Sequence, residues 1–157
     1  MRYKNLLIKF DRGLVGKERF LRLFRSVIND LPLEVTKKLS RKNICFYLTR
    51  LIIYSPPPFT NYFIGKKSTE NLPKSTVVTG GGIAKIKNFR MRAVCFYSDY
   101  VDAFEDSIVR YLIAHEIAHL CLKRPHTEDE ADDQVKRWGF KKEWLAIRHR
   151  DRNALNR

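Results

Sequence analysis

Hydrophobic positions recur along this chain with two different spacings. From Lys17 to Asp30 the apolar residues fall three and four positions apart, which places them on one face of a helix. Residues 33–39 predict a second, shorter helix. Residues 43–54 are instead rich in Ile, Phe, Tyr and Leu, a composition typical of a strand. The first third of the chain therefore predicts two helices followed by a strand.

The middle of the chain predicts loops and a hairpin. The three prolines at 56–58 and the polar stretch 66–74 indicate loops, and the glycines at 80–82 indicate a flexible turn. Segments 82–87 and 91–97 predict two paired strands with a turn around Asn88.

Helical spacing returns in the last third of the chain. Asp102 is a candidate N-cap with Glu105 as its capping-box partner, and two apolar rows follow, which is typical of a buried helix. Pro125 ends this helix, Thr127 caps the next, and Gly139 ends that one. A last short helix around residues 144–147 precedes a basic tail. The whole pattern predicts one α+β domain over residues 1–157: an N-terminal helix, a short mixed or antiparallel sheet, and a set of C-terminal helices.

Composition agrees with a single folded domain. Hydrophobic residues make up 44% of the chain and aromatic residues 12%, which is typical of a globular protein. No apolar run is long enough to span a membrane, and the basic start lacks the apolar stretch of a signal peptide. Three cysteines in apolar surroundings predict free thiols in a reducing compartment. We therefore expect a cytoplasmic protein with no membrane partner.

Charge is spread unevenly over the chain. Residues 1–100 carry 20 Lys and Arg against 6 Asp and Glu, a net charge of +14, whereas residues 101–157 carry 11 of each. Such an asymmetry suggests an anionic partner for the first part, either nucleic acid or an acidic protein. No phosphate loop, zinc finger or RNA-recognition motif accompanies it, and many proteins are simply basic.

One motif carries chemistry. His115-Glu116-Ile117-Ala118-His119 places two imidazoles one helical turn apart with a carboxylate beside them. Two imidazoles can bind zinc, and the carboxylate can act as a general base. The same residues could instead form a solvated face or a satisfied pair in the core. Apolar neighbours argue against a solvated face, and a buried carboxylate between two imidazoles needs a partner such as a divalent cation.

A catalytic zinc needs a third protein ligand and an open position for water. His126 lies one place later than a third-histidine pattern requires. Glu130 stands three residues after Thr127, where a capping-box carboxylate bonds back to the helix start. Glu128 is free of that role and shares an inward face with Asp132, which is placed to accept the free ring N–H of a ligating histidine.

The motif followed by Glu128-x-x-Ala131-Asp132 resembles the gluzincin metallopeptidases. The spacing is most similar to minimal gluzincin-type peptidases, including those related to the repressor-cleaving proteases of phages and mobile elements. The resemblance covers about residues 102–140. It implies a zincin-like fold in which the strand Met91–Tyr97 faces an extended substrate. The alternative for this segment is an ordinary core strand.

The same resemblance implies a role for each site residue. The zinc ion would be bound by His115, His119 and Glu128, with Asp132 behind a ligand and Glu116 as general base. The expected activity is zinc-dependent hydrolysis of peptide bonds in a protein or peptide substrate. One alternative is a non-catalytic, metal-stabilised module that binds nucleic acid or a protein through its basic half. Another is a metal-dependent hydrolase of a non-peptide bond.

Overall fold

Most strands occupy the middle of the chain, and helices occupy both sides of them. The computed structural model describes residues 6–11, 13–14, 16–40, 44–49, 52–55, 63–65, 77–79, 81–85, 92–123 and 125–155. In chain order the elements are β1 Leu7–Phe10, α1 Lys17–Asp30, α2 Leu33–Ser40, β2 Ile44–Thr49, β3 Ile52–Ser55, β4 Phe63–Gly65, β5 Val77–Thr79, β6 Gly81–Lys85, β7 Arg92–Tyr97, α3 Ser98–Ala103, α4 Asp106–Cys121, α5 Glu128–Arg137 and α6 Lys141–Leu155. The predicted α+β class is confirmed.

The larger sheet is mixed, as predicted. Its strand order is β1-β2-β7-β6, in which β1, β2 and β7 run parallel and β6 runs antiparallel to β7. The predicted hairpin corresponds to β6 and β7. The prediction of a single strand over residues 43–54 is wrong. Strand β2 pairs within this sheet, whereas β3 pairs with β4 and β5 in a second, three-stranded sheet. Different partners therefore divide one apolar run into two strands.

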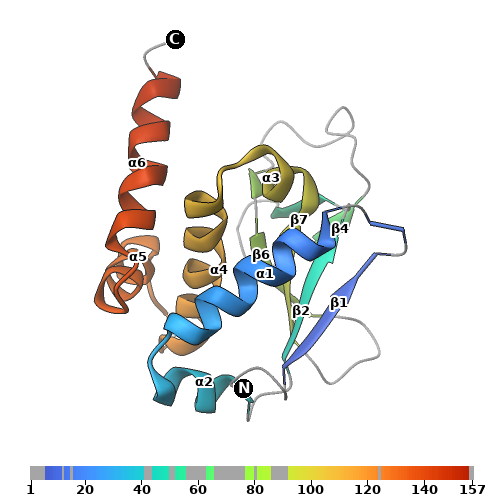
Figure 1. Cartoon of the computed structure of the whole chain (residues 1–157), viewed down its shortest axis with the longest axis horizontal. Helices are drawn as coiled ribbons and strands as arrows, with labels where there is room; N and C mark the ends of the chain where they lie inside the picture. The colour runs from blue at the N-terminus through green and yellow to red at the C-terminus, as the bar shows by residue number, and fades with distance from the viewer. Residues whose placement is uncertain are drawn as a thin grey trace.

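Helix α1 covers one face of the larger sheet (Figure 1). Phe20 packs against Phe96 with ring centroids 5.1 Å apart, and Phe24 packs against Phe46 at 4.8 Å. The predicted helix and its apolar stripe are both confirmed, because the buried residues of α1 are Phe20, Leu23, Phe24, Val27 and Ile28. The aromatic contacts join the helix to β2 and β7 through the hydrophobic core.

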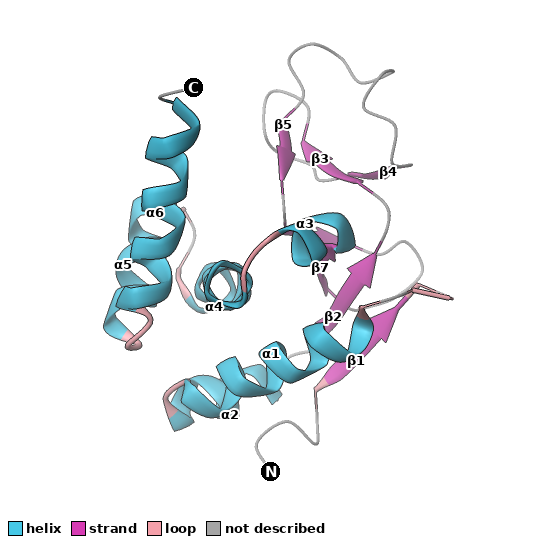
Figure 2. Cartoon of the chain, turned by 45° about the horizontal axis from the view of Figure 1, so that its top comes forward, coloured by secondary structure: helices cyan, strands magenta, loops and turns pink. Residues whose placement is uncertain are grey.

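Helix α4 lies at the centre of the molecule. In Figure 2, which looks along this helix, the sheet lies on one side of α4 and the α5–α6 pair on the other. It contacts α1, β6, α5 and α6, which explains why its sequence is apolar on more than one face. Ten of its sixteen residues are buried, and they include His115 and Glu116. The central helix therefore carries the motif in the interior.

The predicted start of this helix is wrong. Asp102 lies within α3, and α4 begins at Asp106 after Glu105, whose side chain makes no capping hydrogen bond. The reason is a contact distant in sequence: the Arg19 guanidinium donates hydrogen bonds to the carbonyl oxygens of Val101 and Phe104. Arg19 also pairs with the Asp106 carboxylate at 2.7 Å. One cation thus binds the carbonyls at the end of α3 and the acid at the start of α4.

The two C-terminal helices follow the predicted order. Thr127 and Glu130 form the predicted capping box at the start of α5, and Gly139 has a left-handed φ of 96° just after its end. Helix α6 has 15 residues and is longer than expected. Buried Phe140 precedes it, and Trp144 and Ile147 pack against the core.

Several expectations fall on parts of the chain that the structure does not describe. These are the loops at 56–58 and 66–74, Gly80, and the turn around Asn88. In the described ranges, no helix combines the length and hydrophobicity needed to cross a membrane.

Candidate metal centre

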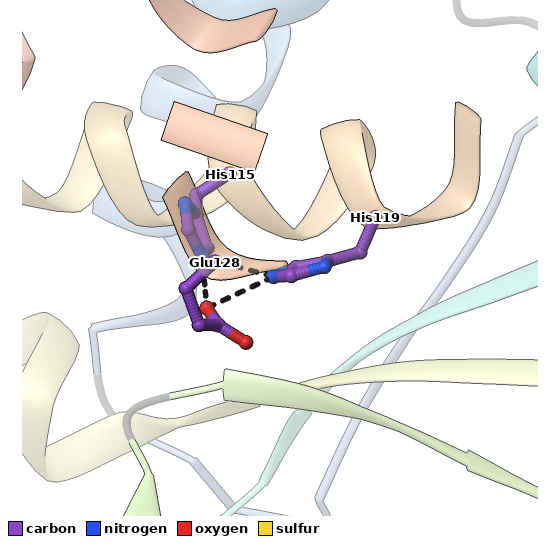
Figure 3. A group of neighbouring side chains, drawn as sticks. All are labelled: His115, His119 and Glu128. Atoms are coloured by element: carbon purple, nitrogen blue, oxygen red, sulfur yellow. Dashed lines mark hydrogen bonds and ion pairs between the residues drawn. The ribbon is translucent and has the colours of Figure 1, made fainter. Parts of the chain in front are cut away.

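The helical spacing of the motif brings two imidazoles together. His115 and His119 lie one turn apart on α4, and their Nε2 atoms are 2.9 Å from each other. His115 is buried and His119 is half-buried. Figure 3 shows both rings directed toward one point beside the helix.

Helix α5 brings a carboxylate to the same point. Because the capping box fixes where α5 begins, Glu128 is its first residue and its side chain extends toward α4. The Glu128 Oε2 atom lies 3.0 Å from His115 Nε2 and 3.3 Å from His119 Nε2 (Figure 3). Glu130 instead accepts the Thr127 backbone N–H at 2.7 Å, as predicted. The three predicted ligands thus lie together, and the competing acid is occupied elsewhere.

These three atoms fit a zinc ion. Two imidazole nitrogens and one carboxylate oxygen are a common catalytic zinc set, and here they lie within 4.8 Å of one another. A tetrahedral ion with bonds of about 2.0–2.2 Å holds its ligands roughly 3.3–3.6 Å apart, so small side-chain shifts would accommodate it. The Glu128 side chain is 78% exposed, which leaves the group open to solvent on that side.

The second nitrogen of His115 has two partners. Asp132 Oδ1 lies 3.0 Å from His115 Nδ1, and the Tyr111 hydroxyl lies 3.1 Å from the same nitrogen. That hydroxyl donates a hydrogen bond to Asp132 Oδ1, while Trp144 Nε1 donates to Oδ2 at 2.9 Å. The sequence pattern predicted Asp132 but not Tyr111 or Trp144. Tyr111 could have been found, because it stands four residues before His115 on the same helical face.

Ionic contacts shift the pKa values of this group. Burial alone would lower the pKa of His115, but hydrogen bonds to Asp132 and Glu128 outweigh it and raise the pKa to about 9. The hydrogen bond to His115, together with the nearby His119, holds the pKa of Glu128 well below its usual value. Burial raises the pKa of Asp132, but its three hydrogen-bond donors outweigh burial and lower the pKa to about 2. Without a metal, an imidazolium between two carboxylates therefore holds the site together.

Glu116 is in a different environment. It is 8% exposed, and burial raises the pKa of its carboxyl group while the neighbouring histidines oppose that shift. Within the described residues, no hydrogen bond joins this carboxylate to another side chain. A buried carboxylate without such a partner is costly, and a nearby cation or bound water would stabilise it.

His126 does not join the group. Its Nε2 atom lies 2.9 Å from His119 Nδ1, which is the ring nitrogen that faces away from His115 and Glu128. A single ion bound at His119 Nε2 therefore cannot reach His126 in this arrangement.

The prediction that the strand Met91–Tyr97 pairs with an extended substrate is wrong. Both edges of β7 are occupied, by β2 on one side and β6 on the other. Among the described strands β6 ends the sheet, and α4 contacts it.

No protein-family model, curated protein or solved structure matches this chain.

Proposed function

We propose that this protein is a zinc-dependent metallopeptidase. One observation carries the proposal: His115 Nε2, His119 Nε2 and Glu128 Oε2 converge at one point, and the buried Glu116 carboxylate lies beside the two histidines in sequence and within range of their charges. Two imidazoles, a carboxylate ligand and an adjacent base are the groups that metal-assisted hydrolysis requires.

The proposed chemistry assigns a separate task to each group. A zinc ion held by His115, His119 and Glu128 would act as a Lewis acid that polarises the scissile carbonyl and eases deprotonation of a water molecule. Glu116 accepts a proton from that water molecule as the water oxygen attacks the carbonyl carbon. It then donates the proton to the amine nitrogen as the C–N bond breaks. Burial raises the pKa of the Glu116 carboxyl group, which makes it a stronger proton acceptor than an exposed glutamate.

The position of β6 supports a peptide substrate over a small molecule. An extended peptide can add to the free edge of a sheet through backbone hydrogen bonds. Among the described strands β6 ends the larger sheet beside α4. A peptide paired there would run alongside the helix that carries His115 and His119.

Glu116→Gln tests the proposal. The purified protein is incubated with zinc and a mixed library of peptides, and cleavage is followed by mass spectrometry. We expect wild type to cleave and Glu116→Gln to bind zinc normally but cleave about 10²–10⁴-fold more slowly, the usual loss for a general base. Glu105→Gln is the control, because Glu105 is an exposed carboxylate at the start of the same helix.

Two results would contradict the proposal. Equal cleavage by wild type and Glu116→Gln would remove Glu116 as the base. A zinc-loaded protein that cleaves no peptide would favour the alternatives, a metal-stabilised binding module or a hydrolase of another bond. Binding of duplex DNA that weakens steeply with salt, by a log–log slope of about −0.9 per phosphate contact, would point to the basic module.

A further inference from the structure

We propose that His126 is a positioning residue that selects the metal-binding tautomer of His119. The inference deepens the proposed metal site and rests on it. His126 lies in the connection between α4 and α5, and nothing in its sequence context assigns it this role. In this role His126 accepts a hydrogen bond from His119 Nδ1, the ring nitrogen that does not face the metal position.

Three contacts define the arrangement. His126 Nε2 lies 2.9 Å from His119 Nδ1, and His126 Nδ1 lies 3.2 Å from the Lys123 carbonyl oxygen. At its other nitrogen, His119 Nε2 faces His115 Nε2 at 2.9 Å and Glu128 Oε2 at 3.3 Å. The two rings thus link a backbone carbonyl to the metal position.

The carbonyl determines where each proton lies. A carbonyl oxygen only accepts, so a hydrogen bond to Lys123 requires the proton of a neutral His126 on Nδ1. Its Nε2 atom then carries a lone pair and accepts from His119 Nδ1–H. His119 Nε2 is left with a lone pair, which can accept a hydrogen bond from His115 Nε2–H, 2.9 Å away, or bind a metal ion. With both rings neutral, no other pair of tautomers satisfies both hydrogen bonds.

The two ligating histidines are therefore held by different chemistry. His115 is held by the Asp132 carboxylate, whereas His119 is held by a second imidazole ring. A metal-ligating histidine usually bonds through its other nitrogen to a carboxylate, a carbonyl or water, and this bond orients the ring. Here His126 is that partner: it contacts His119 through one ring nitrogen and the Lys123 carbonyl oxygen through the other.

The first test uses the metal-free protein. Nitrogen-15 NMR of the histidine rings distinguishes Nδ1–H from Nε2–H tautomers, and we expect His119 of wild type to carry its proton on Nδ1. His126→Leu removes the acceptor, and we expect Nε2–H to become populated at His119. His126→Gln supplies an amide oxygen as acceptor and should restore Nδ1–H. His149→Leu is the control, since His149 is an exposed histidine on α6.

The second test measures metal binding. His126→Leu should lower zinc affinity by about 10–100-fold, the usual loss when the partner of a ligating histidine is removed, and His126→Gln should recover most of it. With Co²⁺ in place of zinc, the visible spectrum of His126→Leu should keep the band positions of wild type, because the ligands are unchanged.

Three outcomes would overturn the inference. They are a wild-type His119 with its proton on Nε2, a His126→Leu variant with unchanged tautomer and affinity, or a Co²⁺ spectrum showing that His126→Leu has lost a nitrogen ligand. The NMR result on wild type needs neither metal nor activity. Failure of the peptidase proposal would therefore leave this test readable, and a folding defect in a variant would not affect the wild-type result.

Discussion

At the scale of single residues, Asp132 shows how a carboxylate can serve several donors at once. Its Oδ1 atom is shared by His115 and Tyr111, and its Oδ2 atom accepts from the Trp144 indole. A carboxylate has about four lone-pair positions, so all three donors can be satisfied together. These bonds hold Asp132 in place from α4 and α6, and Asp132 in turn orients His115.

Tyr111→Phe tests whether this network matters for metal binding. The change keeps the packed ring and removes the hydroxyl, so we expect zinc affinity to fall by about tenfold, at the low end for residues that support a ligand. Competition with a chromophoric chelator measures the affinity. Tyr47→Phe is the matched control, because the Tyr47 hydroxyl donates to Asp11 beside β1, away from the metal group. Equal affinities in the two variants would show that the Tyr111 hydroxyl is not needed.

Glu128→Ala and Glu130→Ala distinguish the roles of two of the three acids in the first turn of α5. We expect Glu128→Ala to lose most zinc binding, because it removes one of three ligand atoms. Glu130→Ala should retain zinc and lose about 1 kcal/mol of stability through the broken capping box. Zinc titration and denaturant unfolding measure the two effects. The reverse result, with zinc lost only in Glu130→Ala, would contradict the ligand assignment.

At the scale of elements, the junction of α3 and α4 depends on α1. Both Arg19 and Arg22 on α1 pair with Asp106 at the start of α4, but only Arg19 also contacts the carbonyl oxygens near the end of α3. The Arg19 side chain is 27% exposed and that of Arg22 is 64% exposed. The start of the helix that carries the metal ligands is therefore set by α1, whose Arg19 lies 85 residues before Phe104.

Arg19→Ala and Arg22→Ala form a matched pair for this junction. Arg19→Ala leaves part-buried carbonyl oxygens without their charged donor, so we expect a loss of about 1–3 kcal/mol in the free energy of unfolding. Arg22→Ala removes only an exposed ion pair and should cost less than about 1 kcal/mol. Denaturant unfolding measures both. Losses of equal size would mean that the carbonyl contacts of Arg19 add nothing to stability.

At the scale of the whole molecule, the titration of the site makes stability and metal binding depend on pH. The pKa of His115 is raised from 6.5 to about 9. In metal-free protein its contribution to the free energy of unfolding is therefore complete below pH 6.5 and is lost as pH rises through about 9. The pKa of Asp132 is lowered from 3.8 to about 2, so its contribution is present above pH 3.8 and is lost as pH falls through about 2. The metal-free site is most stabilising between these limits.

Zinc affinity should rise with pH, whereas the contribution of His115 to the stability of the metal-free protein falls. A ligating imidazole must lose its proton, so zinc competes with the proton that the two carboxylates stabilise on His115. We expect apparent zinc affinity to rise by about tenfold per pH unit between pH 6 and 8, with release of about one proton per ion. Isothermal titration in buffers of different ionisation enthalpy measures both quantities. Affinity that is independent of pH would contradict a protonated His115 in the metal-free site.

Features that depend on neighbours a few residues apart could be predicted from the sequence. Periodicity located α1 to the residue, because one apolar stripe spans the whole helix. Thr127 and Glu130 predicted the capping box, because both partners lie within one turn. The spacing of four between His115 and His119 was enough to place both rings on one face.

Features that depend on contacts between distant parts of the chain are seen only in the folded structure. Arg19 moved the start of α4 away from Asp102, although the local pattern there matched a capping box. Strand pairing divided residues 43–54 between two sheets and occupied both edges of β7. The connection between α4 and α5 brings His126 Nε2 to His119 Nδ1. A local pattern records hydrogen bonds and periodicity within a turn or a strand, whereas these outcomes depend on which distant segments pack together.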